Sequence, residues 1–172
     1  MKNCGWTSAV IESNSVRTEL KMASEIKIKE FNELTLNELY ELLRLRAEVF
    51  VLEQNCAYQD LDGIDYEAVQ LFMLDANGLC SACARIYRDR TDAVVMRIGR
   101  LIARERGRGD GMRLLLACID ECARLGAKSI RLHAQQYAIG FYEKAGFSVC
   151  SEVFLEDGIP HVEMDLVRFS RS

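Results

Sequence analysis

A glycine-rich turn between a strand-like run and a helix-like run is the feature that most restricts how this chain can fold. The turn reads Arg-Gly-Arg-Gly-Asp-Gly-Met over residues 106–112, follows the apolar run 98–103 and precedes the apolar residues 114–119. Bare backbone at a helix start leaves N–H groups that can converge on an anion, and the helix dipole favours negative charge there. A flexible basic loop is the alternative that glycine spacing alone leaves open.

The length and composition predict one globular domain. The chain has 172 residues, of which 49% are hydrophobic and 28% charged, enough to bury a sizeable core. No apolar run approaches the roughly 18 residues that cross a bilayer, and no apolar stretch of secretory length follows Lys2. The net charge of −4 argues against a nucleic-acid binder, whereas the arginines around the turn favour a small anionic ligand. We therefore expect a cytoplasmic protein with neither a nucleic-acid nor a membrane partner.

The seven cysteines predict reduced thiols rather than a metal site. Their odd number and irregular spacing differ from those of a small secreted scaffold, which favours a reducing compartment. Cys80 and Cys83 have a metal-like spacing, but positions three apart in a strand point to opposite faces. Cys118 and Cys122 share a helix face, so we expect them to be small buried thiols.

An acidic loop follows the first predicted helix, with aspartates at positions 60, 62 and 65. It resembles a calcium loop at first sight, but Leu71 stands where the closing glutamate would be. We therefore predict no metal there and interpret the loop as a lip that favours a cationic amine.

Periodicity and turn signals predict the element order β, α, β-β-β, α, β, α, β-β. Thr35 with Glu38 forms a capping box, Asn77-Gly78 marks a hairpin, and Gly126 ends a helix. The expected strands are 26–31, 69–74, 79–87, 93–103, 129–134, 147–155 and 159–167, and the expected helices are 35–50, 110–125 and 139–145. This order predicts an α/β (α+β) domain over residues 24–172 with a single mixed, mostly antiparallel sheet flanked by helices. Residues 1–23 are expected to form a flexible N-terminal tail, and Met22 is a second candidate start.

Two segments resemble the signatures of GCN5-related N-acetyltransferases, the GNAT superfamily. Residues 106–115 resemble its acyl-CoA-binding motif, and residues 138–147, Ala-Ile-Gly-Phe-Tyr-Glu-Lys-Ala-Gly-Phe, resemble its second signature. The two come in the correct order and at the correct distance, and the resemblance spans about residues 26–167. Within the superfamily, residues 46–63, 134–135 and 156–161 are similar to the ElaA-like group. The resemblance implies the acyl-CoA N-acyltransferase fold.

The resemblance also implies which residues bind acetyl-CoA, the expected acyl donor. The backbone of residues 101–103 would pair with the pantetheine arm, the amides of residues 106–112 would hold the pyrophosphate, and Gln135 replaces a cofactor-binding Asn. Tyr142 matches the tyrosine that protonates the departing thiolate. The predicted cofactor-binding residues are Leu101, Ile102, Ala103, Arg106, Gly107, Arg108, Gly109, Asp110, Gly111, Met112 and Gln135. A second register that begins the motif at Arg108 remains open, but the first places Leu114, Leu115 and Ile119 in core positions.

Amine attack on a thioester requires a neutral amine, a fixed donor to the carbonyl oxygen and a proton for the leaving thiolate. For the proton that the amine loses, Glu48, Glu53 and Glu152 are candidate bases by position, although helical carboxylates are normally solvated. We interpret His133 as a satisfied buried imidazole rather than a base, and leave open whether His161 faces the acceptor cleft.

The sequence therefore predicts an N-acetyltransferase that moves an acetyl group from acetyl-CoA directly to a primary amine. A non-catalytic acyl-CoA-binding sensor is the main alternative. A nucleotide-binding module is disfavoured because no Lys-Ser/Thr follows the glycines and no ribose-binding acid ends a second βα unit. The acceptor, a small-molecule or peptide amine, is not identified, and the closing hairpin leaves a homodimer open.

Overall fold

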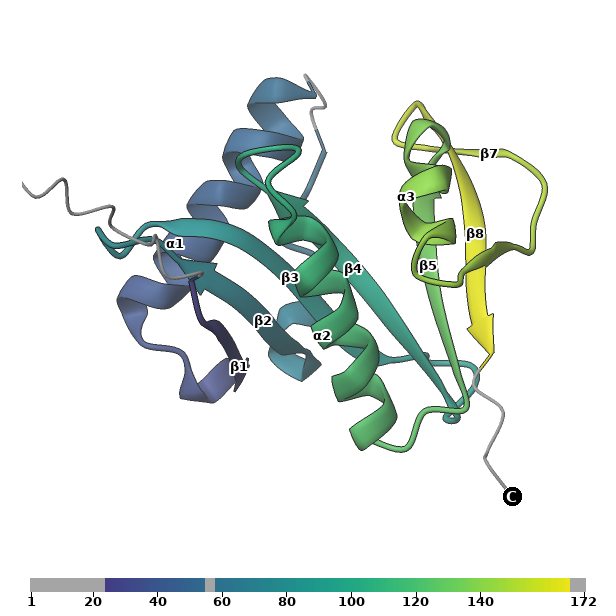
Figure 1. Ribbon diagram of the computed structural model, residues 1–172, viewed down its shortest axis with the longest axis horizontal. Helices are drawn as coiled ribbons and strands as arrows, with labels where there is room; N and C mark the ends of the chain where they lie inside the picture. Colours follow the sequence, from purple (N-terminus) through teal and green to yellow (C-terminus); the bar gives the residue numbers. More distant parts are fainter. Residues whose placement is uncertain (1–23, 55–57, 168–172) are drawn as a thin grey trace, which may run out of the picture.

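The computed structural model describes residues 24–54 and 58–167, so the predicted tail and Met22 lie outside the described residues. Its eight-stranded sheet has the order β1-β2-β3-β4-β5-β8-β6, with β7 also paired to β8 (Figure 1). Only β4 and β5 pair in parallel among the described strands. The predicted mixed, mostly antiparallel sheet is confirmed.

The helices and strands come in the predicted order, and most of their bounds lie close to the predicted ones. The strands are β1 (Ile26–Glu30), β2 (Val69–Leu74), β3 (Cys80–Arg88), β4 (Val95–Ala103), β5 (Ser129–Gln135), β6 (Ser148–Val149), β7 (Phe154–Glu156) and β8 (Ile159–Val167). The helices are α1 (Leu36–Arg46), α2 (Asp110–Arg124) and α3 (Ile139–Glu143), with the π-helix η2 (Ala47–Glu53) and the 3-10 helices η1 (Phe31–Glu33), η3 (Ile64–Glu67) and η4 (Gln136–Ala138).

The first helix begins at the predicted capping box. The Thr35 hydroxyl accepts the amide N–H of Glu38 at 3.2 Å, and the Glu38 carboxylate accepts the amide N–H of Thr35 at 3.0 Å. Two donors at the helix start are thereby satisfied. The helix continues past the predicted end as η2, a wider helical turn of the kind often found at functional sites.

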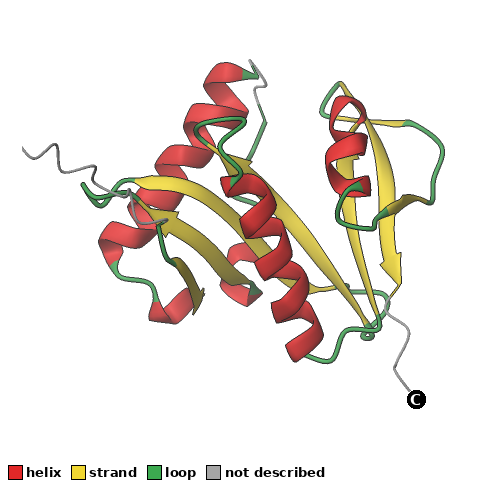
Figure 2. Ribbon diagram, viewed as in Figure 1, coloured by secondary structure: helices red, strands yellow, loops and turns green. Residues whose placement is uncertain are grey.

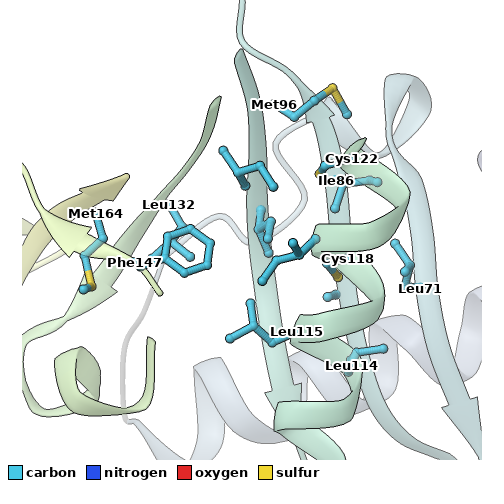
Figure 3. Close-up of a cluster of buried hydrophobic side chains, with 14 of the residues drawn as sticks. Leu71, Ile86, Met96, Leu114, Leu115, Cys118, Cys122, Leu132, Phe147 and Met164 are labelled. Carbon is cyan, nitrogen blue, oxygen red and sulfur yellow. The ribbon is translucent and has the colours of Figure 1, made fainter. Parts of the chain in front are cut away.

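Helices cover both faces of the sheet and create two cores (Figure 1). On one face, α2 buries residues at helical spacing, including Leu114, Leu115 and Cys118, against β2, β3, β4 and β5 (Figure 3). On the other face, Leu42 and Leu45 of α1 pack on Phe72 and its neighbours. Burial of Cys118 and Cys122 confirms their interpretation as core thiols.

Cys80 and Cys83 depart from the predicted arrangement. Both lie in the core beneath α1, not on opposite faces of the sheet. The reason is a β-bulge: Met73 pairs with Ala82 but Leu74 pairs with Cys80, so Ser81 is an extra residue. One inserted residue reverses the alternation and turns both thiols to the same side.

The closing hairpin also differs, because its first arm is not one continuous strand. Between the pairs Val149–Met164 and Phe154–His161, four residues (150–153) stand opposite two (162–163). The Ser151 hydroxyl accepts the amide N–H of Glu163 at 2.8 Å in place of a backbone carbonyl. The predicted strand 147–155 is therefore divided into β6 and β7.

Candidate functional site

The two parallel strands separate soon after they meet. Pairing of β4 with β5 covers only Val95–Arg97 against Ser129–Arg131, after which β4 continues to Ala103 and β5 to Gln135. In Figure 1 the strands meet at the bottom and diverge toward the top. The facing edge of residues 101–103 is therefore free of a strand partner within the described sheet, so its backbone groups are available to a ligand.

A cavity of about 1020 Å³ occupies this divergence and is lined by residues of both strands, of η2 and α3, and of the glycine turn. A volume of this size accommodates a large ligand. The predicted site residues that line it are Leu101, Ile102, Ala103, Arg106, Gly107, Gly109, Gly111, Met112, Gln135 and Tyr142. Arg108 and Asp110 do not line it: Arg108 pairs with Glu105, and Asp110 pairs with Arg113 at 3.3 Å.

The glycine turn connects the end of β4 to the first residue of α2 (Figure 2). Gly107 and Gly109 adopt φ values of 79° and 86°, which disfavour any residue with a Cβ. Gly109 is the N-cap of the 15-residue helix α2, and no side chain caps it. The first-turn N–H groups of α2 therefore begin at the cavity, where the helix dipole attracts an anion.

A second backbone distortion lies inside β4 and was not predicted. Arg100 has φ 55°, and the register between β3 and β4 shifts there, because Cys83 pairs with Ile102 but Arg85 pairs with Gly99. A positive φ in a non-glycine residue is uncommon and marks a bulge that redirects the strand. Gly99 was the sequence signal, because glycine inside a strand often marks such a bulge.

Arg100 also corrects the prediction for the acidic loop. Its Nε donates to Asp60 Oδ1 at 2.6 Å, Arg46 Nε donates to Asp60 Oδ2 at 2.8 Å, and Arg85 Nη1 donates to Asp62 Oδ1 at 2.8 Å. Burial acts to raise the pKa of Asp62, but the Arg85 hydrogen bond and neighbouring arginine charges outweigh it, so the pKa falls to about 2. Because arginines hold these carboxylates, the loop is not a free acidic lip for a cationic amine, and that prediction was wrong.

Tyr142 lies half-buried on α3 at the edge of the α2-side core. Its ring is 5.1 Å from that of Phe141 and 6.1 Å from that of Phe147, both in edge-on contact. Burial raises the pKa of the phenol above its ordinary value, and Tyr137 and Cys118 add to the effect. A phenol is protonated at neutral pH without any shift, and the raised pKa makes it a weaker acid, so proton donation by Tyr142 depends on the position of its hydroxyl. No described residue hydrogen-bonds it.

Gln135 stands at the end of β5 and reaches across the divergence. Its Nε2 donates to Gln54 Oε1, from the end of η2, at 3.2 Å. Both side chains line the cavity. Gln54 is a site residue that the sequence reasoning missed, since nothing in the local pattern predicts that η2 extends this far.

His133 is not a buried imidazole, so that interpretation was wrong. On β5, Leu132 and Ala134 face the α2-side core, which turns His133 to the opposite, exposed face. Its Nδ1 is 2.9 Å from Glu156 Oε2, and both residues line the cavity. His161 also lines it.

The three candidate bases suggested by position do not line the cavity. Glu48 is paired with Arg44 and Arg104, and Glu53 with Arg106, whereas Glu152 is exposed on the segment between β6 and β7. The acidic residues that do line the cavity are Asp62, Glu105, Glu156 and Asp157, and of these Glu156 is the one in contact with His133. The only sequence signal for Glu156 was its position in the turn before β8.

Within residues 24–54 and 58–167, no group of three or more histidine, cysteine or acidic side chains is gathered as a metal site. Across the same residues, no helix is both long enough and apolar enough to cross a membrane.

Comparisons with known proteins agree with this geometry. The family described as acetyltransferase (GNAT) domain matches residues 29–168. A UPF0039 protein of Schizosaccharomyces pombe is 41% identical over 146 residues, which cover 83% of this chain and 96% of that protein. The ElaA protein of Escherichia coli is 40% identical over 137 residues, which cover 77% of this chain and 90% of ElaA.

Two crystal structures share the fold across nearly their whole length. That of Escherichia coli ElaA has a TM-score of 0.77 and 36% identity, and covers 83% of this chain and 99% of its own. That of an acyl-CoA N-acyltransferase from Pseudomonas aeruginosa has a TM-score of 0.76 and 35% identity, and covers 82% of this chain and 98% of its own.

Proposed function

Because this chain belongs to the GNAT acetyltransferase family, in its ElaA-like group, we propose that it transfers an acetyl group from acetyl-CoA directly to a primary amine. The family and the acyl-CoA N-acyltransferase fold support acyltransferase activity in general. The observation that carries the specific proposal is the cavity between the diverging strands β4 and β5, with the glycine turn and the start of α2 along its wall.

The cofactor half of the cavity suits an extended, anionic thioester. The free edge of Leu101, Ile102 and Ala103 offers backbone donors and acceptors to the amides of the pantetheine arm, as an added strand would. The amides of residues 106–112 and the start of α2 suit the pyrophosphate. The side chains of Arg108 and Asp110 point to other partners, so their part in binding is through the backbone.

Tyr142 suits the role of the acid that protonates the leaving thiolate. Its phenol is protonated at neutral pH, as an ordinary tyrosine is, and it lines the cavity beside Phe141. Gln135 would bond the cofactor in exchange for its 3.2 Å hydrogen bond to Gln54.

Thiol release from acetyl-CoA tests this function, measured across a panel of primary amines with the wild type and Tyr142→Phe. We expect amine-dependent release by the wild type and a loss on the order of 10²-fold in kcat for the variant, a typical loss for a general acid. Acetyl-CoA should raise the melting temperature of both proteins, since binding to the folded state alone stabilises it. Stabilisation without turnover on any amine would favour an acyl-CoA sensor, and no stabilisation would reject acetyl-CoA as a ligand.

A further inference from the structure

His133 is the first side chain of β5 on its face of the sheet beyond the last pair with β4. That pair is Arg97 with Arg131, two residues before His133. The equivalent position on β4 is Gly99, which has no side chain, and both residues line the cavity. His133 therefore stands at the point from which the two strands diverge.

A different ionisable side chain lies on each side of the cavity. Tyr142 packs with the α2-side core, whereas His133 projects from the opposite face of β5. A thioester that lies between the strands is thus open to an acid from one face and to a base from the other.

The partners of the imidazole assign its tautomer. Arg97 Nη1, which can only donate, lies 3.4 Å from His133 Nε2, whereas Glu163 Oε1 lies 3.7 Å away, beyond hydrogen-bonding distance, so a neutral ring has its lone pair on Nε2. The ring proton then sits on Nδ1 and is donated to Glu156 Oε2 at 2.9 Å. An imidazole oriented by a carboxylate, with its other nitrogen unprotonated, is the arrangement of a general base.

Two carboxylates and one guanidinium surround the His133 ring. Glu156, at the end of β7, stays ionised because the His133 hydrogen bond lowers its carboxyl pKa, an effect that outweighs burial. Glu163 Oε1, from β8, is 3.7 Å from Nε2. Arg97, from β4, is itself paired with Asp89 and Glu163.

We propose that His133 Nε2 is the base that removes a proton from the acceptor amine, and that Glu156 is the positioning residue that holds its ring, a role that presupposes the acetyl transfer proposed above. The acceptor arrives as an ammonium ion and loses two protons in all. One passes to His133 and then to solvent, which frees the nitrogen lone pair. The amine nitrogen then bonds to the acetyl carbon as the carbon–sulfur bond breaks. The thiolate takes its proton from Tyr142, which the second amine proton restores.

His161, the chain's second histidine, provides a matched control. Its Nδ1 is 2.8 Å from the carbonyl oxygen of Ile159, so its Nε2 also carries a lone pair. It lies on β8, however, which pairs with the far edge of β5 and is one strand removed from the divergence.

Two amines of nearly equal size isolate the proton-transfer step. Ethylamine is an ammonium ion at neutral pH, whereas trifluoroethylamine is largely neutral and needs no base before it attacks. We expect His133→Gln to lower kcat/KM for ethylamine by on the order of 10²-fold or more, within the range for general-base catalysis. For trifluoroethylamine the same variant should lose less than about fivefold, well below that range. Glu156→Gln should also lower kcat/KM more for ethylamine than for trifluoroethylamine, but by a smaller factor than His133→Gln.

His161→Gln should change the two rates by similar factors, because His161 lines the cavity but is not the proposed base. Equal losses for both amines in His133→Gln, with an unchanged melting temperature, would indicate a structural role and overturn the proposal. Full activity of His133→Gln would also overturn the proposal, as would a loss in His161→Gln that is confined to ethylamine. If the wild type releases no thiol with any primary amine of the panel, the proposed transfer fails and the base fails with it, whereas an active wild type beside an active His133→Gln rejects the base alone.

Discussion

A buried ion-pair network joins η3 to α1 and β3, and we expect its loss to lower the free energy of unfolding. Asp65 is shared by two arginines: Arg46 Nη1 donates to its Oδ1 at 2.8 Å, and Arg85 Nη1 lies 3.1 Å from its Oδ2. Gln70 Nε2 donates to Oδ1 at 3.2 Å. The side chains of Arg46 and Arg85 are only 3% and 2% exposed, so neither can replace Asp65 with water.

Asp65→Ala should therefore be strongly destabilising. Removing one partner of a buried pair costs ~3–5 kcal/mol, because a buried charge is left uncompensated. The lower end applies here, since Asp60 and Asp62 still pair with Arg46 and Arg85, respectively. For a domain of this size, a loss of about 3 kcal/mol corresponds to a fall of roughly 6–12 °C in melting temperature.

Urea unfolding followed by circular dichroism measures this loss as a lower midpoint at an unchanged slope. Glu48→Ala is a matched control, because Glu48 is also shared by two arginines but is 42% exposed. It should change the free energy of unfolding by less than about 1 kcal/mol, as exposed pairs do. A loss for Asp65→Ala no larger than that for Glu48→Ala would refute the reasoning.

Three further predictions concern packing, backbone and pH. Leu115→Ala, at a fully buried core position, should lower the free energy of unfolding by about 2–5 kcal/mol in the same urea assay. Gly109→Ala should cost about 1–2 kcal/mol in that assay, because φ is 86° and no other atom lies within 4 Å of the added carbon, which leaves backbone strain as the cause. Asp62 has its pKa lowered to about 2 in the folded state, so its stabilisation is present above its ordinary pKa and is lost as pH falls toward 2. Melting temperatures measured from pH 5 to pH 2 should therefore fall less steeply for Asp62→Asn than for the wild type, and parallel curves would contradict this.

Local rules predicted most of the fold. The capping box at Thr35, the hairpin at Asn77-Gly78 and the glycine stop at Gly126 each depend on neighbouring residues, and each was found where predicted. The buried face of α2 follows the 3.6-residue period, so Leu114, Leu115 and Ile119 were identifiable as core. Most of the residues proposed to bind the cofactor lie in one segment, 101–112, so the same local rules were enough to propose them.

The contacts of the acidic loop and of His133 could not be predicted from the sequence, because they join segments that are far apart in the chain. No local sequence signal marks the bulge at Ser81. The bulge reverses the alternation of side chains along β3, so the predicted side of the sheet for Cys80 was wrong. Asp60 and Asp62 look like free carboxylates until Arg46, Arg85 and Arg100 are brought to them from other elements. The alternation of Leu132 and Ala134 places His133 on the opposite face of β5, but the sequence does not show that this face is exposed.

Amide hydrogen exchange with and without coenzyme A, followed by NMR, tests the central claim most directly. Bound coenzyme A should slow exchange of N–H groups in two segments, 101–103 on the free edge of β4 and 107–112 at the glycine turn and the start of α2. The surface turn at residues 75–78 should be unaffected. Unchanged exchange in both segments with saturating coenzyme A, or protection confined to residues outside the cavity, would contradict the assignment of this cleft as the cofactor site.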